Sequence, residues 1–296
     1  MNRSRKLVLQ KLAGQIASLP LVSLGLRGLM RISPVRTIIA HRLPVTKEFE
    51  FSLAGKTIRY QSSYFDGVGR ILYWIGADRY ERETMIVFGD IIAGVHTFVD
   101  IGANTGFFTL VAAKINPSVS VHAFEPVPAI FQILKRHVEL NGLSGNCRLN
   151  SLAVSDRVGS VPFHIPYETM ASASLNPEGF CHLPGQIVNA RSITLDEYVN
   201  KASLKKVDLL KIDVEGFEPQ VLAGATEVLR RDRPTIICEC LPTADTASIE
   251  NLLLPLGYFF FHLADSGPIK RERIVPDKTG RYQNYLFTVQ TDLFLD

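Results

Sequence analysis

The chain has 296 residues, 46% of them hydrophobic and 21% charged, and its formal net charge at pH 7 is +3. Apolar content at this level can fill a complete core, so we expect one globular domain with extensions. Four cysteines without a Cys-x-x-Cys pair indicate reduced thiols rather than a disulfide framework, which predicts a cytoplasmic protein.

The first 42 residues contain eight basic side chains and no Asp or Glu. Leu, Val and Ile recur there at helical spacing, so we expect residues 1–45 to form a basic amphipathic extension in peripheral contact with anionic membrane. A targeting peptide and a helix packed on the main domain are the alternatives. The uncharged run at 15–26 is too short to cross a bilayer. Aromatic residues are not interleaved with the basic ones, which argues against nucleic-acid binding.

A hairpin and a helix are expected next, within residues 46–95. Residues 49–60 alternate between apolar and polar side chains and turn at Ala-Gly, which predicts the hairpin. Residues 78–93 have helical spacing. From Thr97 onward, strands and helices alternate over residues 96–296, which is typical of a mostly parallel sheet with helices on both faces.

Residues 97–106 read Thr-Phe-Val-Asp-Ile-Gly-Ala-Asn-Thr-Gly, a strand that ends near a carboxylate and turns through glycines into a helix. Such a turn cradles a small charged ligand, because its glycines admit close approach and the helix start offers free N–H groups. A dinucleotide site needs a second glycine where Asn104 stands, which argues against a pyrophosphate. The turn resembles that of class I S-adenosylmethionine (SAM) methyltransferases.

The next acidic landmark is Glu125, at the end of the following apolar run. In this architecture an acid at that point accepts hydrogen bonds from both ribose hydroxyls of the ligand. The third strand region is predicted at 146–154. The resemblance to class I methyltransferases implies a cofactor site that comprises Asp100, Gly102, Ala103, Asn104, Gly106, Glu125, Pro126, Ser151 and Ala153.

The stretch from 161 to 191 is rich in small and turn residues, and we expect an irregular insertion that acts as a lid. The rhythm then resumes with a strand at 207–213, a helix at 217–231 and a strand at 234–240. The final strand, at 284–289, is expected to pair antiparallel.

Three motifs together resemble the FkbM family of SAM-dependent methyltransferases. They are Val-Asp-Ile-Gly-Ala-Asn-Thr-Gly at 99–106, Ala-Phe-Glu-Pro at 123–126 and Lys-Ile-Asp-Val-Glu-Gly-Phe-Glu at 211–218. The resemblance covers roughly residues 80–290. It implies a Rossmann-like sheet of seven strands with the last one antiparallel, and O-methylation of hydroxyl groups.

Three acids are expected at the carboxyl edge of the sheet, where ligands of α/β proteins collect. They are Asp213 and Glu215 after the fourth strand and Glu239 after the fifth, and we predict that they surround the reacting centre. One of them could act as the base that an alcohol needs before it attacks a methyl group. Hard cations also favour such oxygen ligands, but no dense set of ligands is present, so no metal is predicted.

The sequence therefore predicts a SAM-dependent methyltransferase whose acceptor is a hydroxyl of a small molecule, a sugar or a lipid-linked glycan. A nicotinamide-dependent oxidoreductase is the alternative within enzymes. A catalytically silent SAM-fold module tethered to a membrane through residues 1–42 is the alternative from another class.

Overall fold

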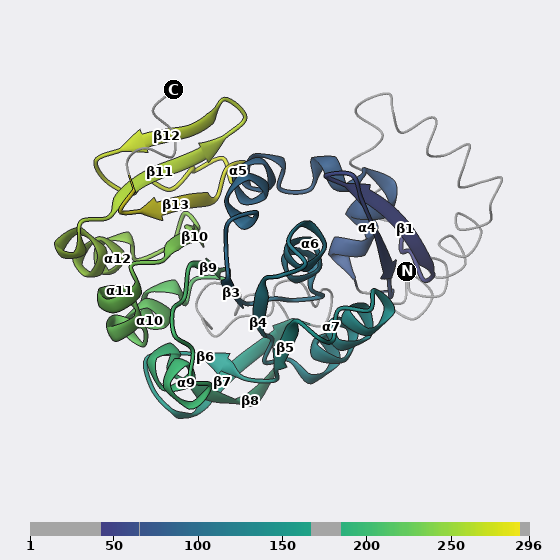
Figure 1. The fold of residues 1–296 in the computed structure, drawn as a ribbon, viewed down its shortest axis with the longest axis horizontal. Coiled ribbons are helices and arrows are strands. Elements are labelled where there is room, and N and C mark those ends of the chain that lie inside the picture. The colour runs from purple at the N-terminus through teal and green to yellow at the C-terminus, as the bar shows by residue number, and fades with distance from the viewer. Residues whose placement is uncertain (1–42, 65, 167–184, 291–296) are drawn as a thin grey trace.

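The computed structural model describes residues 43–64, 66–166 and 185–290. Residues 1–42 of the expected extension at 1–45 and the middle of the expected lid lie outside them. The described residues build a central sheet in the order β12-β11-β13-β10-β9-β3-β4-β5 (Figure 1). In chain order these strands are β3 (Thr97–Ile101), β4 (Ser120–Phe124), β5 (Cys147–Asn150), β9 (Leu209–Ile212), β10 (Thr235–Glu239), β11 (Phe259–Ala264), β12 (Gly267–Arg271) and β13 (Asn284–Thr288).

Strands β5, β4, β3, β9 and β10 are parallel, and β13 inserts antiparallel between β10 and β11. The predicted mixed α/β, Rossmann-like fold with a mostly parallel sheet and the antiparallel final strand are thus confirmed. The predicted number of strands is wrong, because the sheet has eight. The additional strand is β12, which pairs with β11 at the sheet edge through a tight turn before Gly267.

Helices cover both faces of the sheet. Along β3, Phe98 belongs to one apolar core and Val99 to the other, as the two-residue period of a strand requires. On the first face lie α5 (Arg82–Ile92), α6 (Phe107–Ile115) and α7 (Pro128–Leu140). On the second face lie α9 (Leu195–Lys201), α10 (Glu218–Ala223), α11 (Thr226–Asp232) and α12 (Thr246–Leu253), followed by the 3-10 turn η2 (Leu254–Leu256).

The predicted N-terminal hairpin is present as β1 (Glu48–Leu53) and β2 (Lys56–Gln61), followed by α4 (Gly67–Trp74) and the 3-10 turn η1 (Ala77–Arg79). Strand β2 contacts α6 and α7 (Figure 1). Ile58 and Tyr60 are fully buried in the same apolar core as α6. The hairpin therefore belongs to the first face of the main domain.

Two of the predicted elements are broken in the structure. The strand expected at 146–154 ends at Asn150, and β6 (Ala153–Val154) joins a second sheet with β7 (Gly159–Pro166) and β8 (Gly185–Ile193). The two ends of the expected irregular insertion are therefore a strand pair. The helix expected at 217–231 divides at Gly224, where a β-carbon would lie 2.0 Å from the Ser155 carbonyl oxygen.

None of the helices within these described ranges is long and apolar enough to span a bilayer.

Candidate active site

A cavity of about 220 Å³ opens where β3, β4, β9 and β10 end. It brings together most of the side chains that the sequence singled out. Its polar lining comprises Tyr80, Glu81, Asp100, Asn104, Thr105, Glu125, Lys211, Asp213, Glu215 and Glu239. Gly102, Ala103, Pro126 and Ala153 also line it. Ser151 does not. It is exposed at the break after β5, and the neighbouring Leu152 faces the cavity instead.

The glycine turn after β3 adopts left-handed backbone at three positions, with φ of 81° at Gly102, 50° at Asn104 and 93° at Gly106. Asparagine tolerates this region better than most residues, which explains Asn104. Gly106 precedes the first residue of α6 and is not among the lining residues. A β-carbon there would lie 2.5 Å from Leu134 of α7, so this glycine serves the packing of two helices.

Glu125 lies at the end of β4 and is 5% exposed. Its Oε2 accepts from the Asn104 N–H at 3.0 Å and its Oε1 from the Val127 N–H at 2.8 Å. Burial raises the pKa of this carboxyl to about 7, against the two backbone donors that favour the charged form. A carboxylate has about four lone-pair sites, so both oxygens keep acceptor capacity for a ligand.

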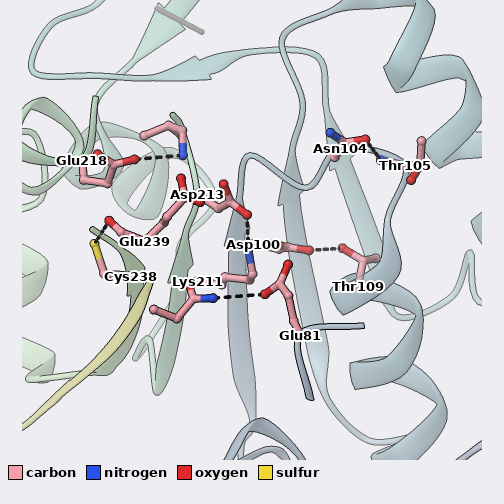
Figure 2. Close-up of polar contacts among 12 residues, drawn as sticks. Glu81, Asp100, Asn104, Thr105, Thr109, Lys211, Asp213, Glu218, Cys238 and Glu239 are labelled. Carbon is pink, nitrogen blue, oxygen red and sulfur yellow. Dashed lines mark hydrogen bonds and ion pairs between the residues drawn. The ribbon is translucent and has the colours of Figure 1, made fainter. Parts of the chain in front are cut away.

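Lys211 is the buried cation of the site, 2% exposed, and Figure 2 shows its ion pair with Asp213. The Lys211 Nζ lies 2.7 Å from the Asp213 Oδ2 and 4.4 Å from the centre of the Phe108 ring. Burial alone would lower the pKa of this ammonium, but the carboxylates of Asp213, Glu81 and Asp100 raise it above its ordinary value. Lys211 thus stays charged and fixes Asp213.

Asp100 is 1% exposed and only half satisfied within the protein. Its Oδ2 accepts from the Thr109 hydroxyl at 2.7 Å (Figure 2), while its buried Oδ1 has no hydrogen-bond partner in the described structure. Burial raises its pKa. An unsatisfied buried carboxylate oxygen beside a cavity is a ready acceptor for a ligand donor.

The predicted edge acids do meet. One oxygen each of Asp213, Glu215 and Glu239 lies within 4.8 Å of the others, a spacing that could hold a metal ion. Burial, followed by repulsion from Asp213, raises the pKa of Glu215 to about 8 and that of Glu239 well above its ordinary value. Glu218 supports their loop, because its Oε1 accepts from the N–H groups of Val214 and Gly216.

Sequence reasoning missed Glu81, which enters the cavity from the start of α5 in left-handed backbone, with φ of 45°. The Asn284 amide at the start of β13 donates to its Oε2 at 3.3 Å. Burial raises its pKa to about 7. Nothing local in the sequence connects residue 81 with the edge acids. Lys211 was also missed, although its place two residues before Asp213 puts both side chains on one face of the strand.

Comparisons with known proteins show which family this chain belongs to. Residues 100–260 match the model of the methyltransferase FkbM domain. The 31-O-demethyl-FK506 methyltransferase FkbM of Streptomyces tacrolimicus is 27% identical over 198 residues, which cover 57% of this chain and 74% of that protein. Methyltransferase 1 of Beauveria bassiana is 31% identical over 176 residues, covering 54% and 71%.

The 2-O-methyltransferase NoeI of Sinorhizobium fredii is 27% identical over 147 residues, covering 46% of this chain and 59% of its own length. Among solved structures, a methyltransferase FkbM from Methylobacillus flagellatus is similar with a TM-score of 0.43 and 14% identity, covering 66% of this chain and 43% of that one.

Proposed function

The chain belongs to the FkbM family of SAM-dependent methyltransferases, and on that premise we propose that it methylates a hydroxyl oxygen of a small molecule, a sugar or a lipid-linked glycan. Its relatives named above include a 31-O-demethyl-FK506 methyltransferase and a 2-O-methyltransferase, which supports an oxygen acceptor.

The charge of the cavity is the observation that favours SAM most. Six acidic side chains line it, against the single ammonium of Lys211. They are Glu81, Asp100, Glu125, Asp213, Glu215 and Glu239. Burial raises the pKa values of several of these carboxyls to neutral pH or above, and a positively charged ligand favours their ionised form. SAM brings such a charge on its sulfur, whereas the doubly negative pyrophosphate of a nicotinamide dinucleotide opposes ionisation of the lining.

The residues of the cavity fit SAM in two places. Glu125 has free acceptor capacity for ribose hydroxyls, and the orphaned Oδ1 of Asp100 can accept from a ligand amino group. We assign five cavity-lining residues to the cofactor: Gly102, Ala103, Asn104, Pro126 and Ala153. Gly106 supports them indirectly, because it lets α6 pack against α7. Ser151 is withdrawn from this set because it faces solvent.

On the acceptor side, we assign Asp213, Glu215 and Glu239 to the reacting centre and add Glu81. The ion pair with Lys211 holds the Asp213 carboxylate in place, so we assign to Asp213 the orientation of the acceptor hydroxyl. Burial raises the pKa of Glu81 to about 7, so its ionised fraction can take the hydroxyl proton near neutral pH. Burial raises the pKa of Glu215 to about 8 and that of Glu239 well above its ordinary value, so these two side chains mostly keep their own protons there. The protein's main task is to align the acceptor oxygen.

Two measurements test this function. Calorimetric titration with S-adenosylhomocysteine and with NAD identifies the cofactor, and binding of NAD alone would favour the oxidoreductase. Incubation with methyl-tritiated SAM and a panel of sugars, nucleotide-activated sugars and hydroxylated macrolides identifies the acceptor class. Tight binding of S-adenosylhomocysteine without label transfer to any hydroxyl would instead favour the silent module.

Peripheral membrane contact of residues 1–42 remains part of this proposal, supported by their eight basic and no acidic side chains. The full-length protein should sediment with vesicles of anionic lipid, and release should grow with salt, because the attraction is screened beyond about 8–10 Å at physiological ionic strength. Replacing Arg27, Arg31 and Arg36 by Glu should abolish sedimentation. Equal sedimentation of both proteins would exclude this contact.

A further inference from the structure

The strand β2 of the N-terminal hairpin reaches the glycine turn that lines the cavity. We propose that Tyr60 and His137 are positioning residues, which hold the backbone of Asn104 and Thr105 in the conformation that binds SAM. This inference rests on the proposed function and adds the hairpin to the cofactor site.

Tyr60 is fully buried, and its hydroxyl lies 2.6 Å from the Thr105 Oγ1. Burial raises the pKa of this phenol well above its ordinary value, so the hydroxyl keeps its proton. A hydrogen bond this deep in the core is not replaced by water when it is lost. The hydroxyl therefore anchors the side chain of Thr105 to the hairpin.

His137 of α7 anchors the same residue through its backbone. Its Nδ1 lies 2.7 Å from the Thr105 carbonyl oxygen, which can only accept, so Nδ1 carries the proton. Its Nε2 then accepts from the Gln61 N–H at 3.0 Å. The ring is fully buried and lies 3.9 Å from the Tyr60 ring, and burial lowers its pKa, which keeps it neutral. The Nδ1 donates to Thr105 in either protonation state, whereas acceptance by Nε2 needs the neutral ring, because a protonated Nε2 would donate to the Gln61 carbonyl oxygen, also at 3.0 Å.

From Thr105 the contacts continue to the predicted ribose acceptor. The Thr105 N–H donates to the Asn104 Oδ1 at 2.8 Å, and the Asn104 N–H donates to the Glu125 Oε2 at 3.0 Å. Asn104, Thr105 and Glu125 all line the cavity. The turn is thus fixed at one end by Glu125 and at the other by Tyr60 and His137.

The docking of the hairpin does not depend on the Tyr60 hydroxyl. The Arg59 N–H donates to the Asn141 Oδ1 at 2.9 Å, and the Asn141 amide donates to the Arg59 carbonyl at 2.7 Å. Ile58 is fully buried in the shared core. The hydroxyl of Tyr60, which also interacts with the buried carboxyl of Asp66, therefore reaches Thr105 from a strand outside the matched residues 100–260.

The test uses the full-length protein and calorimetric titration with S-adenosylhomocysteine. Tyr60→Phe keeps the ring and removes one buried hydrogen bond, so we expect affinity to fall about threefold to tenfold. Tyr258→Phe is the matched control, because its hydroxyl donates to the Pro234 carbonyl at 3.0 Å, it is 3% exposed and it does not line the cavity. That variant should bind as the wild type does.

Variants of Thr105 supply the second arm. Thr105→Val should weaken binding as Tyr60→Phe does, Thr105→Ser should restore it, and the double variant Tyr60→Phe/Thr105→Val should bind no more weakly than either single one. Wild-type affinity in both Tyr60→Phe and Thr105→Val, or equal losses in Tyr60→Phe and Tyr258→Phe, would overturn the inference. A wild-type protein that does not bind S-adenosylhomocysteine would instead overturn the proposed function.

Discussion

Gly102 and the backbone carbonyl of Asp213 are so close that a β-carbon on Gly102 would lie 1.8 Å from that oxygen. The two turns at the ends of β3 and β9 are therefore in direct contact. The sequence pattern suggested that Gly102 makes room for a ligand. The structure shows that it also makes room for the neighbouring turn, which begins at Asp213 directly after β9.

Gly102→Ala should consequently lower the free energy of unfolding. Alanine adds an overlap with backbone, which costs about 1–3 kcal/mol, and a left-handed conformation, which costs about 1–2 kcal/mol. Urea unfolding measures this loss. Gly145→Ala is the control, because a β-carbon there meets nothing within 4 Å and its φ is not positive. Equal stability of the two variants would contradict the close contact.

Glu125→Ala should lower the affinity for S-adenosylhomocysteine by about one to three powers of ten, because hydrogen bonds to a charged group contribute about 1.5–3 kcal/mol each. Glu125→Gln should bind weakly too, since both carboxylate oxygens accept backbone N–H groups and an amide can replace only one of them. Wild-type affinity should rise as pH increases through about 7, where this carboxyl ionises. Calorimetry at pH 6 and 8 measures both effects, and pH-independent binding of all three proteins would argue against this role of Glu125.

Asp213→Asn should lower turnover by about 10²-fold and change S-adenosylhomocysteine affinity much less, because Asp213 orients the acceptor. It should also lower the free energy of unfolding by about 1.5–3 kcal/mol, since buried Lys211 loses a charged partner. Turnover is measured with the hydroxyl acceptor that the labelled-SAM panel identifies. Lost cofactor affinity with normal turnover at saturating SAM would reassign Asp213 to the cofactor.

The stability of the ligand-free protein should fall as pH rises from 6.5 to 8. Burial raises four glutamate pKa values, to about 7 for Glu81, Glu125 and Glu218 and to about 8 for Glu215. Their ordinary value is 4.5, so the folded state keeps protons that the unfolded state has released. Each group therefore contributes stability at low pH that is lost as pH rises through its folded pKa, by up to about 1.4 kcal/mol per pH unit.

His122 and His137 make stability rise with pH, because burial lowers their pKa values. This effect ends near pH 6.5, the ordinary pKa of histidine, so it does not act between pH 6.5 and 8. Urea unfolding across this interval measures the slope. The Glu125→Gln variant should show a shallower one. A slope that is flat or positive in the wild type would contradict the raised pKa values.

Removal of metal should leave function unchanged. Asp213, Glu215 and Glu239 have the spacing of a metal site, but Lys211 already neutralises Asp213. Treatment with EDTA, followed by calorimetry with S-adenosylhomocysteine and by the labelled-SAM assay, should give wild-type values. Loss of label transfer that added Mg²⁺ restores would show that the three acids bind a metal.

The sequence predicted the parallel part of the sheet because its strands are short apolar runs bounded by turn residues. It also predicted that Asp213, Glu215 and Glu239 meet, since parallel strands end at one edge. The sequence-based prediction failed where contacts between distant parts of the chain determine where a strand or helix ends. Nothing local shows that the chain leaves the main sheet after Asn150, which exposes Ser151, or that Gly224 must let the Ser155 carbonyl approach and thereby divides a helix.

Glu81 and Tyr60 escaped prediction for the same reason. Glu81 lines the cavity and Tyr60 contacts the glycine turn after β3. Each side chain forms a hydrogen bond with a residue far along the chain, Glu81 with Asn284 and Tyr60 with Thr105. Helical or alternating periodicity reports which face of an element is buried. It does not report which distant turn that face meets.

The contact of Glu81 with Asn284 joins residues 203 positions apart, and Asn284 begins the strand that fills the gap between β10 and β11. During synthesis on the ribosome, β3, β4, β9 and β10 are complete long before that strand emerges. In a nascent chain, Glu81 therefore lacks its contact with Asn284, and one side of β10 stays unpaired, until residues 284–288 have left the ribosome. Such an unpaired strand invites association with other chains, so this protein should depend on chaperones during synthesis more than its folded stability suggests.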